Sequence, residues 1–512
     1  MVTALLRPDT YPHRPSTVTL EQTHISFVFL AGDHVYKVKK PVKLSFLDFS
    51  TPALRRHFCQ EEVRLNRRLA GDVYFGVVAV CEEHGAFRLG PENDGAAVDY
   101  AVHMRRLPEE RLLNRLLDRD AVSPQMIDLV ARRLADFHRA ADAGPAITAN
   151  GDVAAIRWVL EDNFANARPF RDRTIPARED DHIQAFVNRF LAREEALFRA
   201  RQAEHRIRDC HGDLHADHLC FVDGVVIFDC IEFNPRFRFC DVASDLAFLA
   251  MDLEFHGHPE LAAHLIDRYA AYSGDTTLPQ LIPFYTCYRA YVRGKVDSLK
   301  SVEAEVGEVD REAARTSAQR HFALAYRYSW AGARCLVIIA GLSGTGKSSL
   351  ASALASRTAF AHINSDVVRK SLPDVPPGEL YSGETSARTY RAMFAQAATA
   401  LAGGRGAIVD ATFQRRCDRE MADTLARTLG VPWLLVECQC SDAVVLARLD
   451  ARAAEGCSIS DADRRVYEEQ KRRYEPIVGD EAEGCLVLDT ARPIPASCAA
   501  VEAAIDERLG VS

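Results

Sequence analysis

The sequence predicts a bilobal α+β domain followed by an α/β domain with a parallel sheet. Two observations lead to this prediction. Short strand-like runs separated by Gly, Asn and Asp fill the first hundred residues, and long helical stretches follow them. From residue 335, buried-type strands alternate with helices, as in a parallel sheet. We expect domains at residues 1–330 and 335–512, because 512 residues exceed one ordinary hydrophobic core.

The composition is that of a globular protein, with 48% hydrophobic and 26% charged residues. A net charge of −9 argues against broad adhesion to nucleic acid, although it does not exclude a local basic groove. Arg7 and Pro8 interrupt the apolar start, so no signal peptide is expected, and no run is long enough to span a bilayer. We expect a cytoplasmic protein with free thiols and a small-molecule substrate. The oligomeric state cannot be read from the sequence.

The N-terminal strands surround a helix. Residues 25–40, "ISFVFLAGDHVYKVKK", predict two strands around a turn at Gly32 and Asp33. Residues 55–71 predict a helix that Gly71 ends. Short strands are expected next, at residues 74–81, 86–90 and 97–107.

The rest of the first domain is predicted to be mainly helical. Residues 109–205 and 241–330 show helical patterns, and strands return at residues 218–233. We expect the charged segment 302–330 to end this domain and to act as the join. In the second domain, strands are predicted at 334–341, 407–413 and 433–440, with a helix at 348–358.

The second domain contains the stretch "GLSGTGKS", which satisfies G-x-x-x-x-G-K-[ST] between a predicted strand and a predicted helix. Glycines let backbone N–H groups wrap a polyphosphate at the positive end of the helix. Lys347 would reach the β- and γ-phosphates of ATP, and Ser348 would bind Mg²⁺. The predicted nucleotide-binding residues are Gly341, Leu342, Ser343, Gly344, Thr345, Gly346, Lys347, Ser348 and Ser349.

Further polar residues follow this loop. Asp366 and Arg369 come after the next predicted strand, Asp410 ends the strand in "AIVDATF", and Arg448 and Arg452 lie one helical turn apart. This set resembles the P-loop small-molecule and polynucleotide kinases, including gluconate-kinase-like, zeta-toxin-like and polynucleotide 5′-kinase proteins. The resemblance covers about residues 335–495.

The resemblance implies a role for each of these residues. Asp366 would accept the proton of the attacking hydroxyl, and Arg369 would bind the acceptor. Asp410 would hold Mg²⁺ through water, and Arg448 and Arg452 would belong to a lid over the transferring phosphate. A helix cap at Asp366 and a solvated helix face for the two arginines remain the structural alternatives.

The stretch "HGDLHADH" in the first domain has two interpretations. Its histidines could form a zinc cluster, but Gly212 is poor helix context for such a site. Alternatively, Asp213 belongs to a catalytic loop, because Asp229 ends a strand sixteen residues later. With this spacing the chain resembles the aminoglycoside phosphotransferase family over most of residues 20–300.

This second resemblance implies a kinase-like fold with Asp213 as catalytic residue and Asp229 as metal ligand. Lys37 or Lys39 would bind the nucleotide, Glu62 would pair with that lysine, and residues 103–108 would form the hinge. Asp241 and Asp245 would be structural anchors in the large lobe.

Two features depart from that family. "EQTHISF", with Ser26, stands where a Gly-rich loop is expected, and His218 takes the place of the metal-binding asparagine. Imidazole can bind a divalent ion, but Mg²⁺ prefers oxygen, so Mn²⁺ is an alternative at this site.

The functional prediction is ATP- and Mg²⁺-dependent phosphoryl transfer to a hydroxyl of a small polar metabolite, chiefly by the second domain. A polynucleotide 5′-hydroxyl kinase is the alternative enzyme, favoured by the Asp366–Arg369 spacing and disfavoured by the acidic net charge. The non-enzyme alternative is a nucleotide-gated sensor with an inactive kinase-like first domain.

Overall fold

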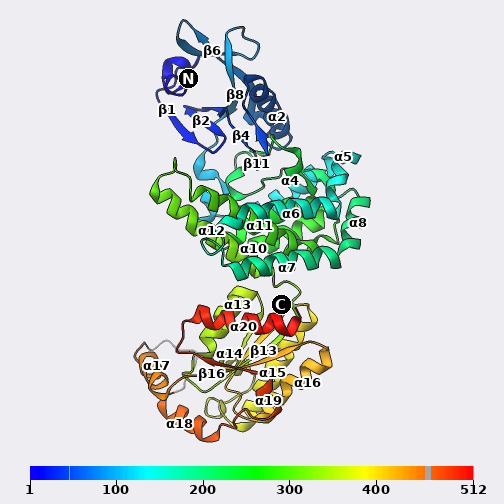
Figure 1. Ribbon diagram of the computed structural model, residues 1–512, viewed down its shortest axis with the longest axis vertical. Helices are drawn as coiled ribbons and strands as arrows, with labels where there is room; N and C mark the ends of the chain where they lie inside the picture. The colour runs from blue at the N-terminus through cyan, green and yellow to red at the C-terminus, as the bar shows by residue number, and fades with distance from the viewer. Residues whose placement is uncertain (45, 456–462, 511–512) are drawn as a thin grey trace. The chain divides into compact units, whose positions relative to one another are not determined.

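The computed structural model describes residues 1–44, 46–455 and 463–510 as two compact units (Figure 1). Unit 1 comprises Met1–Ile175 and Asn188–Phe322, and unit 2 comprises Pro176–Val187 and Ala323–Ser512. These units divide the chain at other residues than the predicted domains, 1–330 and 335–512. Unit 2 begins earlier than predicted, and it includes a segment that lies far upstream in the sequence.

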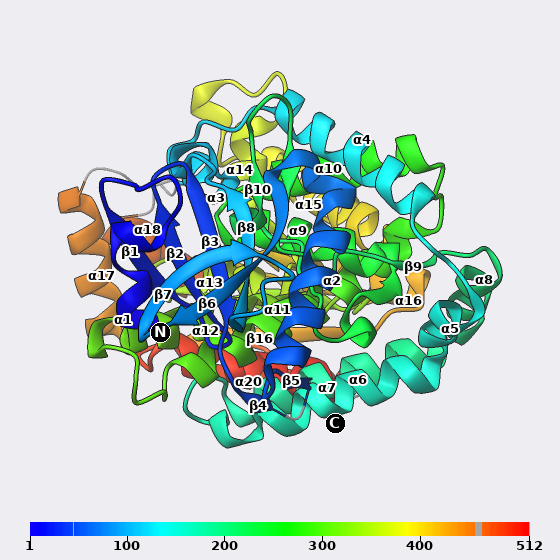
Figure 2. The same cartoon turned by 90° about the horizontal axis from the view of Figure 1, so that it is seen from above.

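Unit 1 begins with a six-stranded antiparallel sheet, seen from above in Figure 2. The predicted pair around Gly32 is present, whereas β1 was not predicted because its sequence, "VTLEQ", has no buried run. The strands, in order across the sheet, are β1 (Val18–Gln22), β2 (Ser26–Ala31), β3 (His34–Lys39), β8 (Ala97–Arg105), β6 (Tyr74–Glu83) and β7 (Ala86–Pro91).

The two faces of this sheet have different partners. On one face, Phe29, Tyr36 and Val38 pack with Leu5 of the short helix α1 (Val2–Leu5). The other face meets α2 (Pro52–Ala70), which starts three residues before the predicted helix because the Thr51 hydroxyl caps it. Residues of a strand alternate between its faces, so Lys37 and Lys39 both lie on the α2 side.

The second lobe of unit 1 is helical, as predicted. Its main helices are α4 (Pro124–Ala140), α6 (Val153–Ala167), α8 (Glu195–Ala203), α9 (Val242–Phe255), α10 (Pro259–Ser273) and α11 (Leu278–Lys300). The strands predicted at 218–233 are reduced to two-residue segments, β10 (Leu219–Cys220) and β11 (Val226–Ile227). A second small pair joins β9 (Ile207–Asp209) to β12 (Phe239–Asp241).

The segment predicted to end the first domain contains helix α12 (Glu308–Tyr328), and the division between Phe322 and Ala323 falls within this helix. Within unit 1, the ring of His321 stacks on Phe255 at 3.8 Å, and Phe322 meets Tyr291 edge-on at 5.1 Å. These buried aromatic contacts make the first part of α12 a part of the large lobe.

Unit 2 is built on a five-stranded parallel sheet, which confirms the predicted α/β class. The strand order is β14 (Ala361–Asn364), β15 (Ala407–Asp410), β13 (Leu336–Ala340), β16 (Trp433–Gln439) and β17 (Cys485–Asp489). The connecting helices are α13 (Lys347–Thr358), α14 (Ser365–Ser371), α15 (Gly383–Ala402), α16 (Arg416–Leu429), α17 (Asp442–Glu455), α18 (Arg464–Arg473), α19 (Asp480–Glu483) and α20 (Ile494–Leu509).

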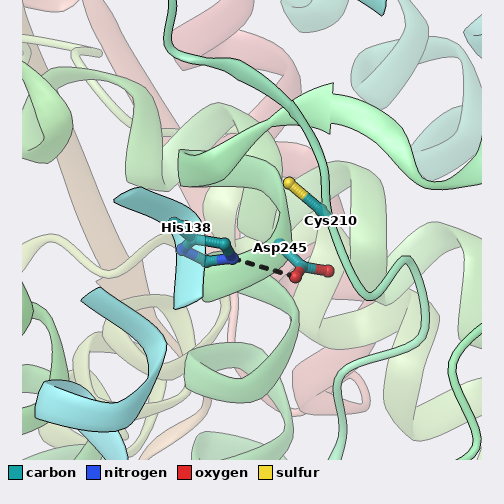
Figure 3. A group of neighbouring side chains, drawn as sticks. All are labelled: His138, Cys210 and Asp245. Atoms are coloured by element: carbon teal, nitrogen blue, oxygen red, sulfur yellow. Dashed lines mark hydrogen bonds and ion pairs between the residues drawn. The ribbon is translucent and has the colours of Figure 1, made fainter. Parts of the chain in front are cut away.

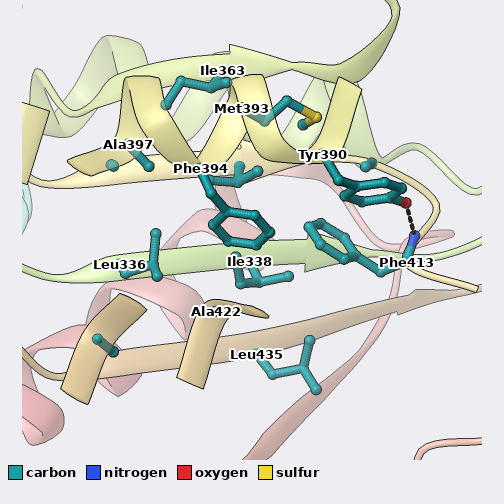
Figure 4. Close-up of a cluster of buried hydrophobic side chains, with 14 of the residues drawn as sticks. Leu336, Ile338, Ile363, Tyr390, Met393, Phe394, Ala397, Phe413, Ala422 and Leu435 are labelled. Carbon is teal, nitrogen blue, oxygen red and sulfur yellow. Dashed lines mark hydrogen bonds between the residues drawn. The ribbon is translucent and has the colours of Figure 1, made fainter. Parts of the chain in front are cut away.

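The core on one side of this sheet positions the strand ends (Figure 4). Leu336 and Ile338 of β13 pack against Phe394 and Tyr390 of α15. The Tyr390 hydroxyl accepts a hydrogen bond from the backbone N–H of Phe413 at 3.1 Å. This bond fixes the loop that follows Asp410 at the carboxyl edge of the sheet.

A segment from helix α7 (Ala177–Arg193) completes unit 2. Arg178 pairs with Glu502 of α20 at 3.0 Å, and Arg357 of α13 pairs with Glu502 at 2.5 Å and with Glu179 at 2.8 Å. Glu502 is fully buried and therefore requires these positive partners. Among the described residues, no helix is both long enough and apolar enough to cross a membrane.

Substitution Glu502→Ala should lower the free energy of unfolding of unit 2 by about 2 kcal/mol, because it leaves two half-buried guanidinium groups without their shared carboxylate. Calorimetry of the full chain measures this change as a lower melting temperature for one transition. Glu507→Ala, at an exposed position on the same helix, is the control and should change stability by less than about 0.5 kcal/mol. Equal effects of the two substitutions would contradict the role of Glu502.

Candidate active sites

The loop before Asp213 in unit 1 is bonded to one buried carboxylate, that of Asp245, which Figure 3 shows with its neighbours His138 and Cys210. Asp245 of α9 accepts hydrogen bonds from the backbone N–H groups of His211 at 3.0 Å and Gly212 at 2.8 Å. His138 of α4 contacts the same carboxylate at 3.2 Å. Burial would raise the pKa of Asp245, but His138, His211 and the backbone hydrogen bond hold the pKa well below its usual value. Asp245 is therefore the anchor that the sequence predicted.

His138, Cys210 and Asp245 lie close enough to be considered as metal ligands. However, the His138 ring already uses both nitrogens, with Nδ1 at 2.8 Å from the Tyr269 hydroxyl and Nε2 facing Asp245. Both oxygens of Asp245 likewise accept hydrogen bonds, from the backbone N–H groups of His211 and Gly212. This group is a structural hydrogen-bond network.

His211 contacts the backbone of Asp213, the predicted catalytic residue. Its Nε2 donates to the carbonyl of Phe228 at 2.9 Å, and its Nδ1 accepts from the backbone N–H of Asp213 at 3.3 Å. Both nitrogens are engaged, so His211 cannot join His215 and His218 around one zinc ion. Burial lowers the pKa of His211 to about 4, which matches a neutral ring.

Asp213, His218 and Asp229 are brought together, as the catalytic-loop interpretation predicts. Nε2 of His218 lies 3.5 Å from the Asp229 carboxylate, and Nε2 of His215 lies 3.5 Å from that of Asp213. Burial would raise the pKa of Asp213, but His215 and His218 hold it well below its usual value. Both aspartates are therefore ionised near neutral pH.

The two lysines of β3 have different environments. Nζ of Lys37 lies 2.5 Å from Asp229 and 3.0 Å from Glu62. Lys39 is completely buried between Glu62, at 2.7 Å, and Glu232. Burial alone would lower the pKa of Lys37, but Asp229 and Glu62 hold the pKa well above its usual value. Lys37 therefore contacts Asp229, the predicted metal ligand, whereas Lys39 is completely buried.

Other residues of unit 1 complete this region. Ser26, the residue suggested for phosphate contact, is fully buried and its hydroxyl has no hydrogen-bond partner among the described residues. Asp241 makes a buried bidentate pair with Arg201, with both hydrogen bonds at 2.6 Å. Asp241 therefore anchors the lobe from inside.

The P-loop of unit 2 connects β13 to α13. Gly341 has a positive φ of 144°, and a Cβ there would come within 2.6 Å of the Cys438 carbonyl, so only glycine fits. Nζ of Lys347 donates to the loop carbonyl of Leu342 at 2.9 Å. Burial lowers the pKa of Lys347, although Asp410 and Asp366 oppose this change. The Ser343 N–H is bonded at 2.9 Å by Gln470 of α18, a contact the sequence did not reveal.

Asp410 lies at the end of β15 and is almost fully buried. Its Oδ2 accepts from the Asn364 amide at 2.7 Å, while its Oδ1 has no partner among the described residues. Asn364 also lies 3.4 Å from the Ser348 hydroxyl and caps α14 through the N–H of Asp366. An ionised carboxylate with a buried free oxygen beside a serine hydroxyl fits a magnesium site. Asn364 was missed because its partners are distant in the sequence.

The predicted acceptor and lid residues surround the same edge. A Cβ on Gly346 would lie 3.2 Å from the Arg448 guanidinium, and Arg452 follows one turn later in α17. Arg448 donates to the carbonyl of Thr490 at 2.7 Å, and the Thr490 hydroxyl donates to the P-loop carbonyl of Thr345 at 2.6 Å. Nε of Arg369 is buried without a hydrogen-bond partner among the described residues.

A cavity of about 480 Å³ adjoins Thr490, and it is lined in part by Gln439, Cys440, Asp489 and Arg492. This volume lies in the range of small-molecule sites. None of the P-loop residues 341–349 lines it.

Comparisons with known proteins give two family matches and several relatives. Residues 34–282 match the phosphotransferase enzyme family, and residues 336–477 match an AAA domain. Uncharacterized proteins of Mycobacterium bovis and Mycobacterium tuberculosis are 33% identical over 453 residues, covering 85% of this chain and 86% of theirs.

Solved kinase structures resemble a third of the chain. A gluconokinase from Sinorhizobium meliloti is 18% identical with a TM-score of 0.26, covering 33% of this chain and 91% of its own. A sugar kinase from Janibacter is 18% identical with a TM-score of 0.27, covering 35% and 98%.

The neutral state of His211 predicts an acid sensitivity of unit 1. An unfolded histidine takes up a proton near pH 6.5, whereas the folded pKa is about 4. Between these values the unfolded state binds more protons, so stability falls as the pH falls, by up to about 3 kcal/mol. Denaturant unfolding from pH 7 to pH 4 measures this loss. His211→Gln should reduce the dependence without abolishing it, because burial also lowers the pKa of His103 to about 4. The exposed His57→Gln should keep the full dependence. Equal slopes for His211→Gln and the parent would show that His211 is charged in the fold.

Proposed function

Because the chain belongs to the family of these mycobacterial proteins and joins a phosphotransferase-family domain to a P-loop domain, we propose that it phosphorylates a hydroxyl of a small polar metabolite. The family membership supports ATP-dependent phosphoryl transfer as the general activity. The proposal adds that unit 2 performs the transfer and that the acceptor binds beside Asp366 and Arg369.

The observation that carries this proposal is the convergence of charged groups at the carboxyl edge of the parallel sheet. Asn364 connects these groups, because it donates to the Asp410 carboxylate at 2.7 Å, lies 3.4 Å from the hydroxyl of Ser348, the residue after Lys347, and accepts from the N–H of Asp366 at 3.0 Å. Phosphoryl transfer requires fixed positive charge around the phosphates and a carboxylate near the attacking oxygen. The edge offers both.

In the proposed reaction, Asp366 accepts the proton of the acceptor hydroxyl. The hydroxyl oxygen forms a bond to the γ-phosphorus, the bond from that phosphorus to the β-phosphate oxygen breaks, and ADP leaves. Lys347 neutralises the phosphate oxygens, and Arg448 and Arg452 stabilise the charge that builds on the transferring group. Arg369 orients the acceptor through its unpaired Nε.

Ser348 and Asp410 are the residues that would hold Mg²⁺. A bound magnesium ion would neutralise the β- and γ-phosphate charges. Asn364 keeps the Asp410 carboxylate oriented, because it donates to Oδ2 and leaves Oδ1 free.

We assign unit 1 a second nucleotide site. Lys37, already paired with Glu62, is the lysine that would contact the phosphates, since Lys39 is inaccessible. Asp213 is the candidate base, and Asp229 and His218 are the candidate metal ligands. The ion pair between Lys37 and the helix carboxylate of Glu62, together with an aspartate that can hold Mg²⁺, is the arrangement that an active kinase-like site requires.

The acceptor class can be identified with γ-labelled ATP. The full chain is incubated with metabolite extract, with aminoglycosides or with a 5′-hydroxyl oligonucleotide. The proposal predicts label in a small phosphorylated metabolite. Label in the oligonucleotide alone would make the protein a polynucleotide kinase, and nucleotide binding without transfer to any acceptor would favour a sensor.

Lys347→Ala should abolish transfer by unit 2, because the phosphate charge loses its fixed counter-charge. The assay uses the full chain with Lys37→Ala, which removes the nucleotide lysine of unit 1. Arg427→Ala, at an exposed position of α16, is the control and should retain the parent rate. Transfer at the parent rate in Lys347→Ala would overturn the P-loop assignment.

Asp366→Asn should reduce the rate constant of transfer by roughly 10²-fold or more while ATP affinity stays within about twofold, the pattern of a lost general base. Single-turnover kinetics and ATP titration separate the two quantities. Asp423→Asn, on the surface of α16, is the matched control. Parallel losses in affinity and rate would make Asp366 a structural residue.

A further inference from the structure

His218 occupies a position in unit 1 where its two ring nitrogens have different partners. It ends the short turn Ala216–His218. Its Nδ1 lies 2.8 Å from the backbone carbonyl of Asp213, and a carbonyl only accepts hydrogen bonds. Nδ1 therefore carries the hydrogen in the neutral ring, and Nε2 carries the lone pair.

This lone pair faces a carboxylate oxygen. Nε2 of His218 is 3.5 Å from Oδ2 of Asp229, while Oδ1 of Asp229 is taken by Lys37 at 2.5 Å. Two acceptor atoms that face each other at this distance are unfavourable unless a positive species lies between them. Because Lys37 contacts Oδ1 of Asp229, Oδ2 remains available for that species.

The surroundings add a further nitrogen and a further carboxylate. The ligand atoms of Asp213, His215 and His218 lie within 4.8 Å of one another. The rings of His215 and His218 are 4.0 Å apart. The site thus mixes imidazole and carboxylate ligands. In unit 2 the groups assigned to the ion, the Ser348 hydroxyl and Oδ1 of Asp410, are oxygens, and His362 lies 3.5 Å from the other oxygen of Asp410, which Asn364 already occupies.

We propose that the nucleotide site of unit 1 takes a divalent transition-metal ion, Mn²⁺ in the first place, bound by Nε2 of His218 and Oδ2 of Asp229 in preference to Mg²⁺. Magnesium favours all-oxygen coordination, whereas manganese and its heavier neighbours accept imidazole. The carbonyl of Asp213 orients the ligand ring through Nδ1, as outer partners of metal-bound histidines do. This inference rests on the second nucleotide site proposed above, and it gives the two units different metal requirements.

The test is a Mn²⁺ titration of the full chain carrying Lys347→Ala, which disables the unit 2 site, in the presence of ADP. Electron paramagnetic resonance measures free and bound Mn²⁺, and pulsed spectra detect nitrogen bound to the metal. Histidines labelled with ¹⁵N distinguish protein nitrogen from nucleotide nitrogen. We expect ¹⁵N coupling in the parent. Displacement of Mn²⁺ from the parent should need a Mg²⁺ concentration at least about tenfold higher than displacement from His218→Asn.

His218→Asn should remove the ¹⁵N coupling, and His215→Asn should retain it. Absence of coupling at bound Mn²⁺ in the parent, its persistence in His218→Asn, or absence of bound Mn²⁺ would each overturn the proposal. The parent measurement is informative even if a variant misfolds. This experiment does not measure phosphoryl transfer, so a failure to find Mn²⁺ at His218 would not affect the proposal that unit 2 transfers phosphate. Likewise, a lack of transfer by unit 2 would not affect the proposed Mn²⁺ site of unit 1.

Discussion

The buried carboxylate of Asp245 is the interaction on which the site of unit 1 depends. An ionised carboxylate that is buried away from water must accept hydrogen bonds from the protein. Asp245 accepts them from the backbone N–H groups of His211 and Gly212, and His138 contacts the same carboxylate. The loop is held rigidly at His211 and Gly212 as a consequence. His211 in turn bonds the N–H of Asp213, so the position of the candidate base derives from a carboxylate in the core of the large lobe.

Unit 2 also fixes the position of its candidate site residues, but it does so with different elements. There the backbone of the P-loop and the end of β15 bring cations and carboxylates to one sheet edge, and Asn364 links the helix cap of α14 to Asp410. Both units keep one carboxylate oxygen satisfied and leave the other available. A buried aspartate oriented in this way can receive a cation without rearranging its surroundings, which lowers the cost of binding.

The sequence predicts those features whose residues are contiguous. The P-loop, the strand pair around Gly32 and the Asp213–Asp229 spacing are local patterns with defined geometry. The sequence does not predict which lysine of β3 is accessible, because that depends on Glu232 far along the chain. It likewise does not predict the Gln470 contact to the P-loop, the role of Asn364 or the membership of α12 in two units. Each of these is decided by tertiary contacts that leave no periodic signal.

The segment Pro176–Val187 makes unit 2 discontinuous in sequence, since Glu179 and Arg178 complete the charges around Glu502. During synthesis this segment leaves the ribosome well before the strands it belongs with, so unit 2 can be completed only when the last helix, α20, has been made. A gene cut between the two family domains would likewise separate the P-loop unit from part of its own core. Separation at that point would therefore leave Glu502 and Arg357 without their partners from α7.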